Sequence, residues 1–210
     1  MPNFISEDQI EQALLKRLKD VHGYELLNCH TTDSDDVNDG SKRRDKRDVV
    51  FKDRLKDAGI RLNKHIPIES IEYAVAQIAD RRPAMSAIAA NKELDALIRD
   101  GVPVQFEDKD GKKQQERVRF IDFNNKDHNQ FLAVTQLWIK GERKYRRPDV
   151  LLYINRIPLV FIELKNSNIK LKTSFEDNLT NYKSDIPQLF LTNAVCVLSN
   201  ALETKVGSVS

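Results

Sequence analysis

Hydrophobic residues in the first half of the chain recur three or four positions apart, which is the spacing of a helix that buries one face. The first helix is predicted over 6–23, where Ser6 can cap the N-terminus and Gly23 can end the helix. Its hydrophobic face is formed by Ile10, Leu14, Leu18 and Val21. The same spacing predicts three more helices, over 48–59, 67–80 and 89–101.

From Pro103 onward, hydrophobic residues alternate with polar ones, as they do along a half-buried β-strand. A turn at 109–113 separates two such segments and predicts a hairpin. A polar helix is predicted over 174–185. Other strands are predicted over 24–29, 130–141, 150–154, 158–162 and 194–200. This mixture of helices and strands predicts a mixed α/β domain.

The segment 31–47 is a polar loop, acidic in its first part and basic in its second. The acidic part does not fit a calcium-binding loop, because Val37 stands where an oxygen ligand is required. A run of charges of this kind is typical of a solvated loop, and we expect one here. For the basic residues 42–47, a contact with nucleic-acid phosphates and a solvated surface both remain open.

The composition adds little about partners. The chain has 210 residues, of which 40% are hydrophobic and 31% charged, enough to bury one sizeable core. The net charge is only +2, so any signal for nucleic-acid binding must be local. Cys29 and Cys196 lie far apart without metal-ligand spacing, which suits a reducing interior. Because no hydrophobic run approaches the roughly 18 residues needed to span a bilayer and no signal peptide is visible, we expect a soluble, cytoplasmic protein that does not enter a membrane.

Three charged residues stand at the ends of the two most hydrophobic strands: Asp149, Glu163 and Lys165. Side chains alternate between the faces of a strand, so Glu163 and Lys165 share one face. A loop of odd length between the strands, for example three residues with a bulge, places Asp149 on that face as well. A two-residue turn at 155–156 would place the two carboxylates on opposite faces. If the charged residues act together, an odd-length loop is therefore predicted.

Two carboxylates on one face repel each other, and a divalent cation removes that conflict. Mg²⁺ prefers oxygen ligands and commonly binds one or two carboxylates together with water and a substrate phosphate. A bound metal lowers the pKa of a water molecule, and Lys165 could orient that water or offset charge on a phosphoryl group. These are the parts of a phosphodiester hydrolase. The structural alternative is an exposed Glu-x-Lys ion pair worth about 0–1 kcal/mol.

The segment 147–166, RPDVLLYINRIPLVFIELKN, resembles the PD-(D/E)xK nuclease signature in the form found in R (motor) subunits of type I restriction enzymes. Segments 4–18 and 175–190 also resemble the N-terminal nuclease domain of that family. The resemblance implies a restriction-endonuclease-like α/β core, with a mixed central sheet flanked by helices. It implies one nuclease domain over 1–210, with a helical insert at about 49–101.

The same resemblance assigns roles to the charged residues. Asp149 and Glu163 would hold Mg²⁺, and the backbone carbonyl of Leu164 would be a further metal ligand. Lys165 would be the catalytic lysine. The resemblance therefore implies a Mg²⁺-dependent endonuclease domain that hydrolyses phosphodiester bonds of DNA without sequence specificity of its own.

Three accessory residues follow from the resemblance. The family often carries Gln-x-x-x-Tyr on the helix after the signature, and that register here gives Asn178 and Tyr182. Asn178 keeps the amide but is one methylene shorter, while Tyr182 matches; an ordinary half-buried aromatic is the alternative for Tyr182. In such nucleases a carboxylate of the first helix often approaches the metal. Glu11 is the candidate, and a solvated helix carboxylate is the alternative.

A basic cluster directly precedes Asp149 in the sequence. Such side chains neutralise backbone phosphates without reading sequence, and an aromatic residue among them, Tyr145, can stack on a base. We expect the cluster to contact double-stranded DNA. It consists of Lys140, Arg143, Lys144, Arg146 and Arg147.

The chain has no P-loop motif, so it cannot bind ATP in that way. In the resembled family an ATP-driven motor follows the nuclease domain, so we expect this chain to be a fragment with the helicase/translocase region beyond Ser210. The partners implied are the modification (methyltransferase) and specificity subunits. Two alternatives stay open: a catalytically silent nuclease-like module for DNA binding or subunit assembly, and a free-standing PD-(D/E)xK repair nuclease.

Overall fold

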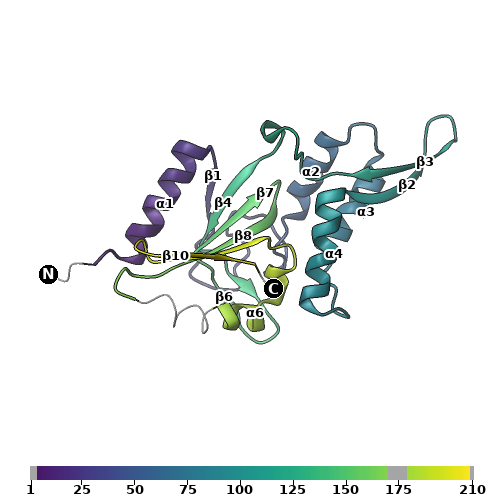
Figure 1. Cartoon of the computed structure of the whole chain (residues 1–210). Coiled ribbons are helices and arrows are strands. Elements are labelled where there is room, and N and C mark those ends of the chain that lie inside the picture. Colours follow the sequence, from purple (N-terminus) through teal and green to yellow (C-terminus); the bar gives the residue numbers. More distant parts are fainter. Residues whose placement is uncertain (1–3, 170–178, 209–210) are drawn as a thin grey trace.

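A six-stranded mixed sheet forms the centre of the molecule in a computed structural model that describes residues 4–169 and 179–208 (Figure 1). The strand order is β1-β4-β7-β8-β9-β10. The pairs β1–β4 and β8–β9 are parallel, and the other neighbours are antiparallel. The strands are β1 (Glu25–Asn28), β4 (Phe131–Thr135), β7 (Val150–Ile154), β8 (Ile157–Leu164), β9 (Val195–Ser199) and β10 (Thr204–Gly207). The predicted mixed α/β architecture is confirmed.

Figure 1 shows helix α1 on one side of the sheet and α2, α3 and α4 grouped on the other, beside a projecting hairpin, β2–β3. The helices are α1 (Glu7–His22), α2 (Lys52–Leu62), α3 (Ile68–Ala79), α4 (Ala87–Asp100) and α6 (Thr180–Asp185), with 3-10 turns η1 (Lys126–His128) and η3 (Pro187–Phe190). Two small sheets pair β2 (Val102–Glu107) with β3 (Lys113–Val118), and β5 (Ile139–Lys140) with β6 (Tyr145–Arg146). None of the described helices is long and apolar enough to cross a membrane.

Helix α1 begins and ends as its sequence predicts. Ser6 and Gln9 form a capping box, in which each side chain satisfies the other residue's backbone N–H, and Gly23 ends the helix at φ 70°. The buried face differs by one position from the prediction. Leu15 is buried with Ile10 and Leu18, whereas Val21 is 65% exposed.

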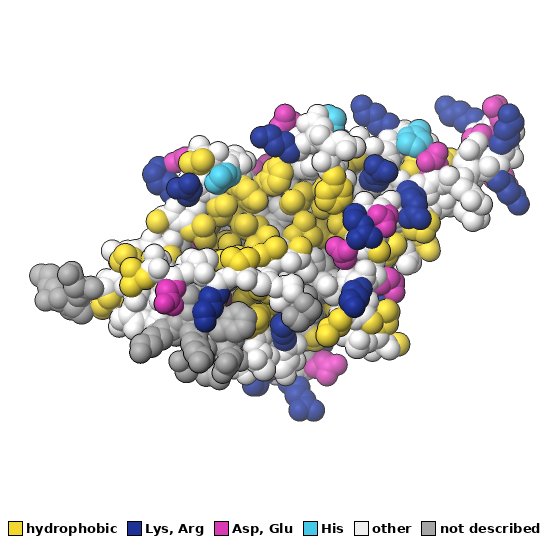
Figure 2. All heavy atoms as spheres, viewed as in Figure 1, with side chains coloured by type: hydrophobic (Ala, Val, Ile, Leu, Met, Phe, Trp, Pro, Cys, Tyr) yellow, Lys and Arg dark blue, Asp and Glu magenta, His cyan; other side chains and the backbone are white. Residues whose placement is uncertain are grey.

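The two faces of the sheet pack against different helices, because successive side chains of a strand point to opposite sides. On one face, Val150 and Ile162 form a cluster with the buried side chains of α1. On the other face, Leu151 and Phe161 join the larger core that includes α2, α3, α4 and Tyr182 of α6. Hydrophobic side chains remain visible over the middle of the sheet in Figure 2, so the helices leave part of it uncovered.

Close packing joins the group of helices to the rest of the core. A side-chain Cβ at Gly59 of α2 would lie 2.7 Å from Cγ2 of Ile71 on α3 and 2.9 Å from Cε1 of Phe120. Only glycine fits there without displacing a neighbour. The helices predicted between 48 and 101 are therefore confirmed as elements that share the central core.

Two predicted strand boundaries are wrong. The strand expected over 130–141 is broken into β4 and β5, because Gln136 adopts a left-handed conformation at φ 57°. The residues after β9 were not predicted to be a strand, yet β10 pairs with β9 through Lys205 opposite Leu198 and Val206 opposite Val197. Backbone pairing with a neighbouring strand organises β10, although its side chains are exposed.

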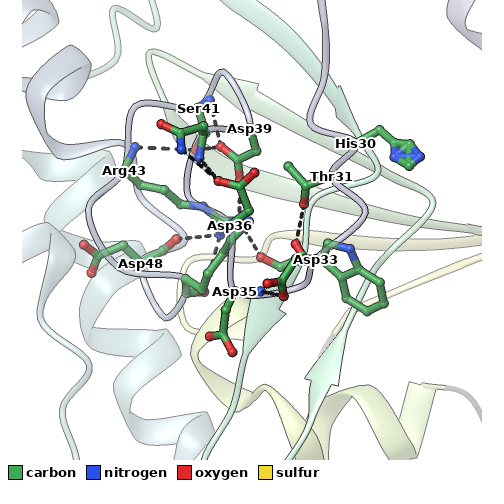
Figure 3. A network of polar contacts seen from close by, with 12 residues as sticks. His30, Thr31, Asp33, Asp35, Asp36, Asp39, Ser41, Arg43 and Asp48 are labelled. Carbon is green, nitrogen blue, oxygen red and sulfur yellow. Dashed lines mark hydrogen bonds and ion pairs between the residues drawn. The ribbon is translucent and has the colours of Figure 1, made fainter.

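The expectation of a solvated loop over 31–47 holds for much of the segment, but it is wrong for Asp39, Arg43 and Lys46 (Figure 3). Asp39 accepts hydrogen bonds at 2.9 Å from both Arg43 and Lys46, and none of these three side chains is more than 2% exposed. Burial by itself would raise the pKa of Asp39. Hydrogen bonds from Ser41 and Lys46 have the opposite and larger effect, so the pKa of Asp39 lies below its ordinary value. An ionised aspartate therefore pairs with two cations of the same loop, and Arg43 also donates to the carbonyl of Trp138 outside it.

Candidate active site

The β7–β8 hairpin brings the charged residues together by a route that differs from the predicted one. Its turn has two residues, Asn155 and Arg156, both at positive φ (48° and 74°), so the prediction of an odd-length loop is wrong. A bulge in β8 then shifts the register by one residue between Leu152 and Tyr153. Beyond the bulge Val150 lies opposite Ile162, and the next pair of this register is Asp149 and Glu163. The prediction that these two carboxylates share a face is confirmed.

The turn is held by a buried asparagine. The side chain of Asn155 donates to the carbonyl of Phe120 at 2.7 Å and accepts from the backbone N–H of Gln130 at 2.8 Å. Asn155 is fully buried, so these bonds form where water cannot replace them. They hold the left-handed turn and therefore the register of the hairpin between the turn and the bulge.

Direct contacts connect the residues at the open end of the hairpin. Asp149 Oδ2 accepts a hydrogen bond from the backbone N–H of Leu164 at 2.6 Å. Lys165 Nζ donates to Glu163 Oε1 at 2.7 Å and to the Leu164 carbonyl at 2.8 Å. The ammonium group thus contacts two of the three oxygen-bearing groups that the sequence suggested as metal ligands.

Burial controls the electrostatics of this site. Glu163 is only 5% exposed, and burial together with the charge of Asp149 raises its pKa to about 7. Burial also raises the pKa of Asp149, although the Leu164 N–H and the charge of Lys165 oppose the change. The pKa of Lys165 is raised despite its burial, because Glu163 accepts its hydrogen bond and both carboxylates attract its charge. Burial thus disfavours the ionised form of both carboxylates even with Lys165 present.

Tyr182 of α6 lies against the same site. Its ring packs edge-on against Phe161 with ring centroids 5.1 Å apart, and its hydroxyl donates to the Arg147 carbonyl at 3.2 Å. Hydrogen bonding to Tyr182 also lowers the pKa of Glu163, against the effect of burial. Tyr182 therefore contacts the site, while Asn178 lies outside the described residues.

The N-terminus of α1 lies on the acidic side of the site. Burial raises the pKa of Glu11, and the charge of Asp149 raises it further, so the two carboxylates are electrostatic neighbours. Glu7 raises the pKa of both Asp149 and Lys165. The backbone N–H of Glu7 donates to Asn166 Oδ1 at 3.0 Å, and this bond ties the helix to the end of β8. Asn166 was not identified from the sequence, since no local pattern marks an asparagine whose partner lies far away along the chain.

The basic cluster is partly neutralised by acidic side chains of the same chain. Lys140 pairs with Asp35 at 3.1 Å, and Lys144 and Arg146 both pair with Asp185. These contacts leave fewer free cations than the sequence suggested.

Two residues of the cluster have different surroundings. The Arg147 guanidinium stacks over Trp138 at 4.9 Å from the ring centre, and its charge lowers the pKa of both Asp149 and Glu11. Arg143 is exposed on the turn between β5 and β6. Arg147 is thus placed to meet an external anion near the acidic pair, and Arg143 is exposed on the turn that precedes it.

The donors at the open end of the hairpin fit a magnesium ion better than a transition metal. Among the described residues, no group of three or more His, Cys, Asp or Glu side chains is arranged to hold a metal. The oxygen donors at the open end of the hairpin are two carboxylates and one backbone carbonyl. A metal ion bound by these three groups would have further coordination positions for water or a phosphate. Burial, and then the charge of Asp149, raise the pKa of Glu163. A divalent cation held by both carboxylates would stabilise their ionised forms.

The chain is similar in sequence to subunits of type I restriction enzymes. Over residues 4–210 it matches the family described as the Type I restriction enzyme R protein N terminus, and it belongs to that family. It is 32% identical over 211 residues to the type I restriction enzyme HindI endonuclease subunit of Haemophilus influenzae, covering 98% of this chain and 19% of that protein. It is 30% identical over 215 residues to the putative MjaIXP endonuclease subunit of Methanocaldococcus jannaschii, covering 97% of this chain. The chain spans about a fifth of the length of these relatives, 19% in both cases.

Proposed function

We propose that this chain is a Mg²⁺-dependent DNA endonuclease domain with a PD-(D/E)xK core, acting in the R subunit of a type I restriction-modification enzyme. The observation that carries the proposal is the convergence of Asp149, Glu163, the Leu164 carbonyl and Lys165 at one end of the β7–β8 hairpin. Membership of the R protein N-terminus family and the names of its relatives support it.

Asp149, Glu163 and the Leu164 carbonyl would hold the metal ion. When bound there, Mg²⁺ would neutralise charge on the phosphoryl group and lower the pKa of a coordinated water. The Leu164 N–H fixes the orientation of Asp149 by donating to Oδ2. Tyr182 packs against Phe161, and its hydroxyl lies close enough to Glu163 to lower the pKa of that carboxyl by hydrogen bonding.

Lys165 holds its proton, because its pKa is raised by the two carboxylates. Its Nζ lies within hydrogen-bonding distance of Glu163 and of the Leu164 carbonyl, so it stands where a phosphate oxygen bound to the site would meet a positive charge. A fixed ammonium at that position stabilises the negative charge that develops as the phosphodiester bond breaks. Lys165 would therefore act on the reaction itself.

DNA would be delivered to the site by the rest of the assembly. A surface that contacts only backbone phosphates binds duplex weakly, with Kd values of roughly 10⁻⁴–10⁻⁶ M at physiological salt. We expect little or no cutting by this 210-residue chain alone at micromolar concentration with Mg²⁺. Cutting should appear with the full R subunit, its modification and specificity subunits and ATP, which would be bound outside this chain.

The decisive experiment replaces Asp149 and, separately, Glu163 by alanine in the full R subunit and measures DNA cleavage in the assembled complex. Both variants should abolish cleavage but leave ATP hydrolysis intact, and this chain with either change should lose Mg²⁺ binding in a calorimetric titration. Glu142→Ala, an exposed carboxylate on the neighbouring turn, is the matched control and should keep both properties. Wild-type cleavage by the Asp149→Ala or Glu163→Ala subunit would overturn the proposal. Efficient cutting of plain duplex by the 210-residue chain would instead favour a free-standing nuclease.

A further inference from the structure

A charged pocket lies away from the candidate active site, between the loop at 41–44 and the start of α2. Its volume is about 320 Å³. Asp48 and Asp53 also line it, and Asp48 is engaged by Lys52 at 2.9 Å. The pocket therefore has a net positive wall. Its cationic residues are Lys42, Arg43, Arg44, Lys52 and Arg54.

The pocket opens onto the N-terminus of α2. Residues 51–54, which form the first turn of the helix, all line it. Phe51 stands at the N-cap position and has no side chain that can accept the free N–H groups of that turn. Unsatisfied N–H groups and the helix dipole together favour an anion at such a position.

Arg43 adds a fixed charge behind this helix terminus (Figure 3). Its side chain is only 1% exposed and lines the pocket, and its Nε has no hydrogen-bond partner among the described residues. The other guanidinium nitrogens donate to Asp39 at 2.9 Å and to the backbone carbonyl of Asp48 at 3.2 Å. Arg43 is thus held rigidly and cannot swing out to solvent.

The buried cluster behind the pocket carries more positive than negative charge. Asp39 is the shared partner of two buried cations, Arg43 and Lys46. Backbone carbonyls satisfy some of the N–H groups but carry no formal charge. An uncompensated buried charge is costly, and an anion in the adjoining pocket would compensate it. This excess charge is independent of the helix terminus and points to the same kind of ligand.

The pocket is separate from the acidic pair. Phe51 stacks on Tyr153 with ring centroids 4.7 Å apart, and its N–H donates to the carbonyl of Arg156, so the pocket lies at the turn end of the β7–β8 hairpin. Tyr153 is four residues along β7 from Asp149, which corresponds to roughly 13 Å at about 3.3 Å per residue. An anion in the pocket would therefore not touch the candidate metal ligands.

We propose that this pocket binds a phosphate group, held by the first-turn N–H groups of α2 and by the side chains of Lys42 and Arg44. The phosphate belongs either to the DNA backbone or to a small phosphorylated compound. The proposal concerns binding alone and stands whether or not the chain cleaves DNA.

The test is an NMR titration of the 210-residue chain with inorganic phosphate, following the backbone amides of Lys52, Asp53 and Arg54. Saturable shifts of these amides are expected. The double variant Lys42→Gln and Arg44→Gln, which changes only exposed side chains, should weaken phosphate binding at least about tenfold. Asp53→Asn should strengthen it, because a negative charge leaves the pocket wall.

The matched control removes two exposed lysines from the tip of the β2–β3 hairpin, in Lys109→Gln with Lys112→Gln, and should leave phosphate binding unchanged. Absence of amide shifts in the wild-type chain, or equal weakening in the control, would overturn the proposal. Titration with a short DNA duplex then identifies the source. If the same amides shift, and the pocket variant lowers the slope of log K against log salt by about 0.9 per lost contact, the phosphate is that of DNA. If they shift with inorganic phosphate only, the ligand is a small phosphorylated compound.

Discussion

Removing the charge of Glu163 should change how the stability of the protein depends on pH. The pKa of this buried carboxyl is raised from its ordinary value of 4.5 to about 7, chiefly by burial and then by the charge of Asp149. Between these two pH values the unfolded chain has lost the proton of Glu163, while the folded chain still holds it. The folded state therefore binds more protons, and the free energy of unfolding falls as pH rises through this window.

A shift of that size corresponds to about 3 kcal/mol. Because Glu163 is only 5% exposed, little of this is screened by solvent. In the absence of divalent metal, the free energy of unfolding of the wild-type chain should thus fall by about 3 kcal/mol between pH 4.5 and pH 7, relative to that of Glu163→Gln. At higher pH the gap between the two free energies should stay constant. The glutamine keeps the shape and the acceptor oxygen but cannot ionise.

Urea denaturation at pH 5 and pH 8, with a chelator present, measures this difference directly. Glu107→Gln, which removes a carboxylate from the exposed end of β2, is the control and should follow the wild type. Adding Mg²⁺ at pH 8 should then stabilise the wild type in proportion to RT ln(1 + [Mg²⁺]/Kd) and leave Glu163→Gln unchanged. Parallel pH profiles for wild type and Glu163→Gln would refute the reasoning, because they would mean that Glu163 ionises as freely as in water.

Three further outcomes are expected. Asp39→Ala should destabilise the protein by about 3–5 kcal/mol in urea denaturation, because it leaves two buried cations without their carboxylate, whereas Asp110→Ala at a hairpin tip should have little effect. Lys165→Ala in the full R subunit should sharply reduce cleavage and barely change DNA affinity; a fully active variant would remove Lys165 from the reaction. Arg143→Ala with Arg147→Ala should lower the salt slope of DNA binding by about 0.9 per contact, and an unchanged slope would assign both to a solvated surface.

The sequence alone determined most of the secondary structure, because the signals that set helix ends and strands are local. Ser6 and Gly23 mark the ends of α1 through bonds made within one turn, and the helical and alternating patterns predict α2, α3, α4 and the central strands. Asp149, Glu163 and Lys165 could also be singled out, because charge at the end of a hydrophobic strand is conspicuous without any knowledge of the fold.

Only the tertiary structure decided how these residues meet. The two-residue turn alone would place Asp149 and Glu163 on opposite faces. A bulge in β8, opposite Leu152 and Tyr153, shifts the register by one residue and brings them to the same face. Whether such a bulge forms depends on how the strand packs against its neighbours. In the same way, no local pattern shows that Asp39 lies buried among cations instead of in solvent, or that Asp185 and Asp35 neutralise part of the basic cluster. The energy of a charge depends on what surrounds it in space, and residues far away in the sequence supply those surroundings.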